Sequence, residues 1–475
     1  MASLAIGAGV GGASLVSKNS SSAPHPGPPS GPERPAVAAW PSPADAERAR
    51  IATLLRRTTF GFTAAELERA SHDGFERTVD RLIETGVAEP PNLIQPDDPA
   101  RGAQLGSDDL QRWWLAHMLT SPARFGERMT YFWHGHFTSE IDKSGGLFMY
   151  WQNLTWRRMA FGRLGEMLAA VTVDPGMLTY LDLTTSDASN PAQPPNENYA
   201  RELLELFSMG PGPYRETDVK GAARALAGWT APPADAQVEV VTDPATGAKE
   251  MVDVWHRQQQ GVFDRARSFP NRVSFLGRYG HLDVKAVVDQ VLARPDTAPF
   301  IARKVALNFI SSNPAPETIS ELAQTFRRSR YDVKALLRAA FSSREFSAQQ
   351  SYRSLVKSPV ELMAGAAMAV GLPVKETVEL MVGYADATGQ VLFSPPNVSG
   401  WPANRGWISP ATVLARLNFA GEIVGSVDPP PSADNAPELH LDGVLGESTR
   451  RRMDTAATDR ERWLALLASP EFQLK

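Results

Sequence analysis

Apolar residues recur along most of the chain at helical spacing. Within residues 44–60, Ile51, Leu54 and Leu55 fall on one side of a helix. Because the helix lengths vary and many connections are long, the pattern predicts a mainly α protein built as an irregular multi-helix domain, not an up-down bundle. Further helices are predicted at residues 63–71, 74–86, 108–121, 123–134, 147–170, 195–209, 215–229, 283–294, 297–311, 316–328, 332–342, 357–370, 374–385, 410–425 and 457–468.

One stretch breaks the helical pattern. In residues 236–256, QVEVV and MVDVWH alternate apolar and polar positions around DPATGAK, which is typical of two strands joined by a turn. We therefore expect a small β-hairpin insertion in a single large helical domain that spans residues 43–475. Near the end of this domain, a Pro-rich loop at about residues 427–438 precedes the last predicted helix.

Residues 1–42 have a different composition from the rest. Residues 2–17 carry no charge and are rich in small apolar side chains, as in the apolar part of a signal peptide, but no basic segment precedes them. The Ser/Pro/Gly-rich residues that follow are typical of a tether that cannot fold. We expect export to the periplasm or cell envelope. A disordered leader on a cytoplasmic protein is the alternative.

Composition removes several classes of function. The 475 residues have a net charge of −5, which is no signature of nucleic-acid binding. There is no cysteine, so disulfides, thiolate metal sites and cysteine nucleophiles are excluded. No apolar run reaches the ~20 residues of a transmembrane helix. The P-loop, the G-x-S-x-G elbow and the HExxH motif are all absent.

The first candidate for chemistry is a pair of histidines. His134 and His136 are separated by one glycine, and positions two apart share a face only where the chain is extended. A helix that ends at Gly135 would leave His136 just beyond it, so that both imidazoles could converge on one point. Neutral imidazole is a common metal ligand. The alternative is one histidine packed among aromatic residues and the other exposed.

The second candidate is the helix expected in PPNENYARELLELFSMG, residues 194–210, with Asn196 as N-cap and Gly210 at its end. Its polar face is denser in charge than packing requires. Glu202 or Glu205 could bind a metal or act as a general acid or base. The alternative is a solvated face with a Glu197–Arg201 pair four residues apart. The candidate catalytic residues are Glu197, Arg201, Glu202 and Glu205, and the candidate metal ligands are His134, His136 and Glu202.

Two other segments bear on packing or binding. In residues 214–230 we expect a helix capped by Thr217. The run of small apolar residues in this helix suits close packing.

The loop at residues 389–419 is rich in Gly, Pro, Asn and Trp and leads into a helix at Ser409 and Pro410. Aromatic faces suit sugars or apolar ligands, although such a loop could also simply close the core. Its candidate ligand-binding residues are Asn397, Trp401 and Trp407.

Six strings stand in order along the chain: LLRRTTFG (54–61), RMTYFWHGHF (128–137), NENYARELLELFSMG (196–210), YRETDVKGAARALAGW (214–229), SLVKSPVELM (354–363) and LFSPPNVSGWPANRGWIS (392–409). Together they resemble the bacterial domain of unknown function 1800 family. That resemblance implies an exported protein, often with a twin-arginine-type leader, and frequent company of a second secreted protein with a sulfatase-like or phosphatase-like fold. It implies no reaction, since none is assigned to the family.

The sequence departs from the family pattern in FDRARSFPNRVSFLG, residues 263–277. Ser268, Phe269 and Val273 stand where members commonly carry a His-Asp pair and a lysine. If that pair completes a site with the two histidines, this chain lacks part of it.

Three hypotheses of function follow from the sequence. The first is a divalent-metal-dependent hydrolase or oxygen-using enzyme with a His/Glu site. The second is a non-catalytic binding or assembly protein of the cell envelope that acts with a secreted partner. The third is an inactive, diverged member of a catalytic family.

Overall fold

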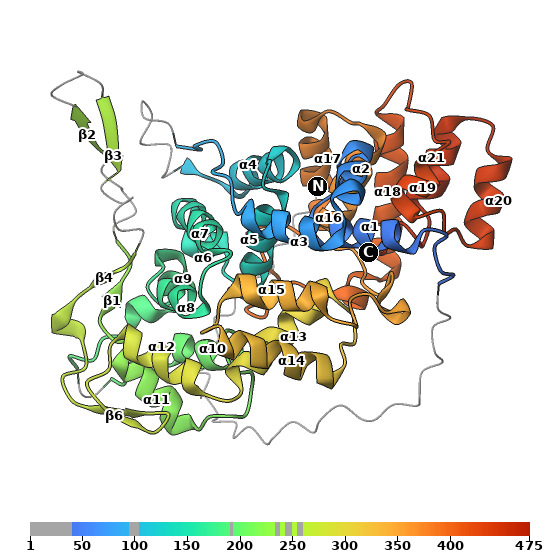
Figure 1. The fold of residues 1–475 in the computed structure, drawn as a ribbon. Helices are drawn as coiled ribbons and strands as arrows, with labels where there is room; N and C mark the ends of the chain where they lie inside the picture. Colours follow the sequence, from blue (N-terminus) through green and yellow to red (C-terminus); the bar gives the residue numbers. More distant parts are fainter. Residues whose placement is uncertain (1–39, 95–103, 191–192, 233–237, 243–248, 254–259) are drawn as a thin grey trace, which may run out of the picture. The chain divides into compact units, whose positions relative to one another are not determined.

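Amphipathic helices dominate the computed structural model of the protein, as the spacing of apolar residues predicts (Figure 1). The structure describes residues 40–94, 104–190, 193–232, 238–242, 249–253 and 260–475. Within these ranges it contains the following α-helices: α1 (Ala46–Thr58), α2 (Ala64–Asp73), α3 (Phe75–Glu84), α4 (Ser107–Thr120), α5 (Arg124–His136), α6 (Ile141–Ser144), α7 (Gly146–Met159), α8 (Leu164–Thr172), α9 (Pro175–Tyr180), α10 (Asn198–Glu205), α11 (Glu216–Ala225), α12 (Val284–Ala293), α13 (Thr297–Phe309), α14 (Pro316–Arg328), α15 (Val333–Ser342), α16 (Pro359–Val370), α17 (Val374–Thr388), α18 (Pro410–Gly425), α19 (Ala436–Leu441), α20 (Glu447–Thr455) and α21 (Asp459–Leu467).

Capping residues set several helix starts. Ser358 caps α16 and forms a reciprocal capping box with Glu361, while Pro359 occupies the first helical position. Ser409 and Pro410 start α18 in the expected way. In α11 the expected cap is wrong: the helix begins at Glu216, because the Asp218 carboxylate accepts the backbone N–H of Arg215.

The single helix expected at residues 147–170 is two helices, α7 and α8. The chain between them pairs with a distant segment: the Leu164 N–H donates to the Tyr331 carbonyl at 3.0 Å, and the Val333 N–H donates to the Gly162 carbonyl at 3.1 Å. These tertiary hydrogen bonds replace the helical ones, although the apolar pattern runs through the break.

The small β elements lie between α11 and α12. Strands β2 (Val238–Thr242) and β3 (Lys249–Asp253) form the expected antiparallel hairpin. Two further antiparallel pairs among the described residues were not expected. They are β1 (Trp229–Thr230) with β4 (Val262–Phe263), and β5 (Val273–Phe275) with β6 (Arg278–Gly280).

Residues 40–475 form one compact unit with two apolar clusters. Helix α5 serves both. Phe125 and Trp133 lie in the first cluster, while Tyr131 packs against the second. Helix α5 packs against α1, α3, α4 and α7 (Figure 1), and most of its residues are buried, with Arg124 partly exposed and Gly135 exposed. Arg128, His134 and His136 are among the buried residues.

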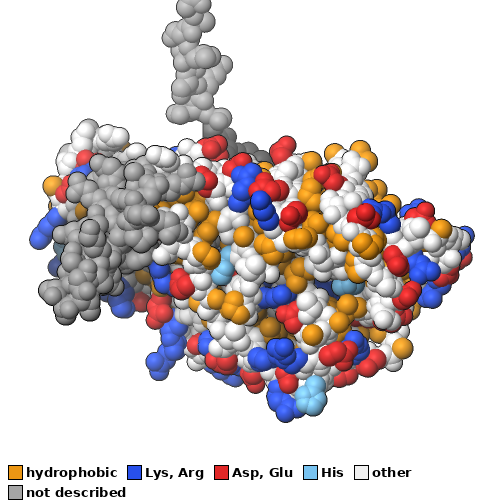
Figure 2. Space-filling view, turned by 90° about the horizontal axis from the view of Figure 1, so that it is seen from above, with side chains coloured by type: hydrophobic (Ala, Val, Ile, Leu, Met, Phe, Trp, Pro, Cys, Tyr) orange, Lys and Arg blue, Asp and Glu red, His pale blue; other side chains and the backbone are white. Residues whose placement is uncertain are grey.

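On the face shown in Figure 2, acidic and basic side chains alternate with apolar ones and no large area has a single charge. No helix in the described ranges combines the length and apolarity needed to cross a bilayer.

Candidate functional site

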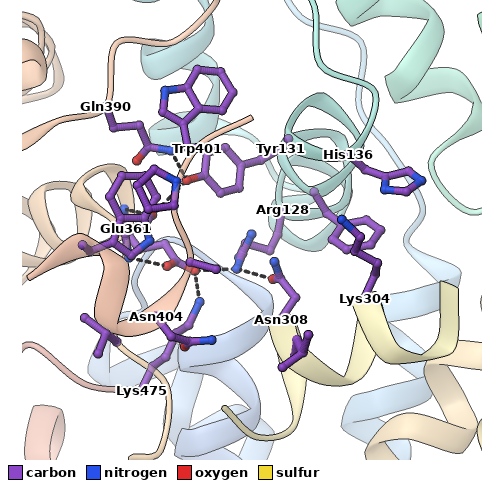
Figure 3. A pocket seen from close by; sticks show the side chains of 18 of the residues that line it. Arg128, Tyr131, His136, Lys304, Asn308, Glu361, Gln390, Trp401, Asn404 and Lys475 are labelled. Carbon is purple, nitrogen blue, oxygen red and sulfur yellow. Dashed lines mark hydrogen bonds and ion pairs between the residues drawn. The ribbon is translucent and has the colours of Figure 1, made fainter. Parts of the chain in front are cut away.

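A cavity of about 270 Å³ lies beside α5 (Figure 3). Arg128, Tyr131 and His136 reach it from α5, and Lys304 and Asn308 reach it from α13. The remaining walls come from Glu361 at the start of α16, from the loop that carries Trp401, Asn404 and Trp407, and from Lys475. Segments far apart in the sequence thus meet at one hollow.

Glu361 is the centre of the charged wall. Its Oε1 lies 2.5 Å from Nη2 of Arg128 and is ion-paired with Nζ of Lys475. Its Oε2 accepts the backbone N–H of Ser358 at 2.8 Å. Burial favours the neutral acid, but the two cations outweigh burial and hold the pKa of Glu361 at about 2. The carboxylate is therefore ionised.

Arg128 is held by more than this ion pair. Its Nη2 also donates to Oδ1 of Asn308 at 2.8 Å. Nε and Nη1 are buried and have no hydrogen-bond partner among the described residues. The guanidinium carbon lies 5.1 Å from the centre of the Tyr131 ring and 5.4 Å from that of Phe309, which is within cation–π range.

Lys304 differs from the other two cations. Among the described residues no carboxylate or hydrogen-bond acceptor pairs with its ammonium group, which lies 5.4 Å from the centre of the Phe300 ring. Burial lowers the pKa of Lys304. Burial also lowers the pKa of Lys475 to about 7, against the opposing effect of Glu361. Of the described residues lining the cavity, three are cationic and one is anionic.

Opposite tautomers distinguish the two histidines. Nε2 of His136 lies 3.1 Å from the Phe207 carbonyl oxygen, so Nε2 carries the proton and Nδ1, which is buried without a partner, presents a lone pair. Nε2 of His134 instead accepts the Phe393 N–H at 3.3 Å. Burial lowers both pKa values to about 3, so both rings are neutral.

The expected convergence of these rings does not occur. His136 is the last residue of α5 and not a residue beyond it, so the two side chains leave the helix in different directions. His134 packs against Trp114, Phe393 and Trp401. In the part of the chain that the structure describes, no group of three or more His, Asp or Glu residues could hold a metal ion.

The expected N-cap Asn196 is wrong, because Glu197 is the N-cap of α10, and the helix ends at Glu205, before Gly210. The candidate catalytic residues Glu197, Arg201, Glu202 and Glu205 lie outside the cavity lining. Arg201 forms two 2.8 Å hydrogen bonds with Glu216 and lies 3.6 Å from Glu197 and 3.9 Å from Glu205. Glu205 also accepts a hydrogen bond from the Tyr214 hydroxyl. Glu202 is half-buried, and its pKa is raised by burial and then by Glu205. The structure brings Glu202 together with its neighbours on α10 and not with His134.

Only some of the candidate residues in the loop at residues 389–419 line the cavity. Trp401 and Trp407 do. Asn397 does not, because its side chain closes a turn by accepting the Ser399 N–H at 2.9 Å. Ser268, where the family resemblance led us to expect part of a His-Asp pair, donates to the Arg265 carbonyl at 2.7 Å, and Phe269 lies under Arg224.

Most of the charged wall was missed by reasoning from the sequence. Arg128, Lys304, Glu361 and Lys475 were not candidates, because charges on amphipathic helices ordinarily face solvent. A signal did exist. Arg128 and Glu361 both stand within the strings RMTYFWHGHF and SLVKSPVELM that carry the family resemblance.

Comparison with known families decides the relationship, since a family model described as protein of unknown function (DUF1800) matches residues 53–474. The chain belongs to the DUF1800 family. The match covers both apolar clusters except Ile51 and Ala52, and it covers every cavity residue named above except Lys475. No curated protein and no solved structure matches the chain. The DUF1800 assignment gives the family of the chain and names no reaction.

Proposed function

We propose that this chain is a binding protein for a small anionic ligand, held in the cavity between α5, α13 and α16. The observation that carries the proposal is Lys304, a partly buried cation without a counter-charge among the described residues. Burying an unpaired charge is costly. An anionic group of a ligand would supply the missing partner, and Arg128 and Lys475 add positive potential to the same wall.

The matched test removes this one charge. Lys304→Met keeps the length and the apolar stem of the side chain but loses the ammonium group. We expect calorimetric titration with sulfate or D-glucuronate at low salt to show binding to the wild type and a loss of at least about tenfold in affinity in Lys304→Met. The control is Lys285→Met, at a side chain that is 81% exposed and pairs with Asp289 at 2.7 Å. Equal affinity in both variants would contradict the proposal.

A divalent-metal-dependent hydrolase or oxygen-using enzyme is the second candidate. Its support is the Nδ1 lone pair of His136, a buried ring atom that has no hydrogen-bond partner among the described residues and whose chemistry suits metal coordination or proton transfer. The support is narrower than that for anion binding, because His134 accepts a hydrogen bond from Phe393 and neither His134 nor Glu202 lines the cavity. Elemental analysis of the wild type, His136→Ala and Glu202→Gln tests it. A stoichiometric metal lost in either variant would favour the enzyme.

We also propose that the chain works in the periplasm or cell envelope beside a secreted sulfatase-like or phosphatase-like partner. The composition of residues 2–17 and the family resemblance support this. Cell fractionation of the natural host and co-purification from the envelope fraction are the tests. A purely cytoplasmic pool would count against export, and envelope protein recovered without such a partner would count against the pairing.

A further inference from the structure

Resting on the anion site proposed above, we propose that the ligand is a sugar acid whose carboxylate faces Lys304 and whose ring stacks on Trp401. The cavity joins three kinds of group that such a ligand needs: an unpaired cation, an aromatic face, and polar groups suited to hydroxyls. An inorganic anion needs only the first, and an apolar acid needs only the first two.

The cation defines where the carboxylate lies. Arg128 and Lys475 are already neutralised in part by Glu361, whereas Lys304 is not. In Figure 3, Lys304 and His136 lie on one side of Arg128, away from Glu361 and Lys475. A carboxylate at Lys304 therefore avoids the repulsion of Glu361 and lies close to His136.

Trp401 supplies the face for the ring. It is partly buried, lines the cavity, and has its ring centre 5.2 Å from that of His134. His134 is itself fixed by its hydrogen bond from Phe393. The indole is thus held by His134 and lines the cavity, where its aromatic surface suits the C–H groups of a pyranose.

Hydroxyl recognition follows from the lone pair of His136. Since Nε2 donates to the Phe207 carbonyl, Nδ1 can only accept, and it needs an O–H or N–H donor from the ligand. Sulfate has no such hydrogen and neither does an unsubstituted alicyclic carboxylate. The side chain of Asn404 also lines the cavity and has no hydrogen-bond partner among the described residues, so it can both donate to and accept from hydroxyls.

Four probes separate these contributions in titrations of the full-length protein. D-Glucuronate has the charge and the hydroxyls, cyclohexanecarboxylate has the ring and charge without hydroxyls, methyl β-D-glucoside has the hydroxyls without charge, and sulfate has charge alone. We expect glucuronate to bind at least about tenfold more tightly than each of the others. Saturation-transfer NMR would extend the measurement to affinities weaker than about 1 mM.

Two variants assign the contacts. Trp401→Leu and His136→Gln, which keeps an amide donor for Phe207, should each weaken glucuronate binding by about tenfold and leave sulfate binding within about twofold. Sulfate or cyclohexanecarboxylate binding as tightly as glucuronate, and depending on Lys304, would overturn the sugar acid and leave the anion site. Glucoside binding equal to glucuronate, or no binding of any anion, would overturn both.

Discussion

The carboxylate of Glu361 lies 2.5 Å from the guanidinium of Arg128, and both side chains are almost completely buried. Lys475 pairs with the same oxygen. One carboxylate thus offsets two buried cations. This network holds α5 against α16 and forms one wall of the cavity.

Glu361→Gln should accordingly be strongly destabilising. The amide keeps the shape of the side chain but leaves Arg128 and Lys475 without a counter-charge, and breaking a buried ion pair in this way costs about 3–5 kcal/mol. Denaturant unfolding of both proteins measures the difference. The matched control is Glu379→Gln, at an exposed carboxylate 3.0 Å from Arg112, where the cost should be below about 1 kcal/mol. Similar costs at both positions would show that the network is not an electrostatic one.

Asp174 makes a second prediction, about pH. Its Oδ1 accepts from Gln152 at 2.7 Å and from the Met177 N–H at 2.8 Å, while Oδ2 is buried without a partner among the described residues. Burial raises the pKa of Asp174 to about 7, against these hydrogen bonds. Because the folded state holds the proton more tightly than the unfolded state, this group lowers stability as pH rises from about 4 to about 7.

Asp174→Asn should remove the loss of folding stability that the ionisation of Asp174 causes as the pH rises. The amide oxygen can keep both hydrogen bonds, and the variant should be as stable as the wild type or more so at pH 7, with a flatter stability profile between about pH 4 and 7. Thermal unfolding across that range is the measurement. Asp174→Ala, which deletes the cap of α9, should cost about 1 kcal/mol. Unchanged pH dependence in Asp174→Asn would show that the carboxyl is ionised in the fold.

The helices could be predicted from the sequence because each buries a stripe of apolar residues, and the local spacing of those residues reveals the stripe. The features that the sequence did not predict depend on residues far away in the chain. The break between α7 and α8 is made by Tyr331 and Val333, and no spacing within residues 147–170 shows it. Strands β5 and β6 are three residues each, too short for an alternating pattern to be recognised.

The site was predictable only where a residue type was conspicuous. His136, Trp401 and Trp407 were candidates because of their chemistry, and all three line the cavity. Lys304 and Glu361 looked like ordinary surface charges. Glu361 also had a sufficient local role, since it completes the capping box of Ser358. Both side chains are withdrawn from the surface because α5, α13 and the start of α16 meet at one cavity, which is a property of the fold and not of a motif.

Close packing of α11 gives a third prediction. The small residues expected in α11 allow the helix to pack closely against strand β5. Gly221 is the critical one, because a Cβ added to it would lie 2.1 Å from the Ser274 carbonyl oxygen of β5. Gly221→Ala should cost at least about 1–3 kcal/mol, because backbone must move. Gly383→Ala is the control, at an exposed helical position with nothing within 4 Å, where alanine should add about 0.5–1 kcal/mol of stability. Equal effects in denaturant unfolding would contradict this packing.

Anion binding should weaken as pH rises above about 7. Lys475, whose burial lowers its pKa to about 7, lines the cavity with Lys304, whose pKa burial also lowers. A bound anion favours the protonated lysine and raises its pKa, so binding takes up a proton above the free-state pKa, and affinity falls by up to about tenfold per pH unit for each lysine. Titration of D-glucuronate from pH 5.5 to 9 at constant ionic strength, repeated in buffers of different ionisation enthalpy, measures both the affinity and the proton uptake. Lys475→Met should bind more weakly at pH 6 and show less of this decline, whereas Lys285→Met should keep it. A flat profile in the wild type would mean that neither lysine changes its protonation when the anion binds.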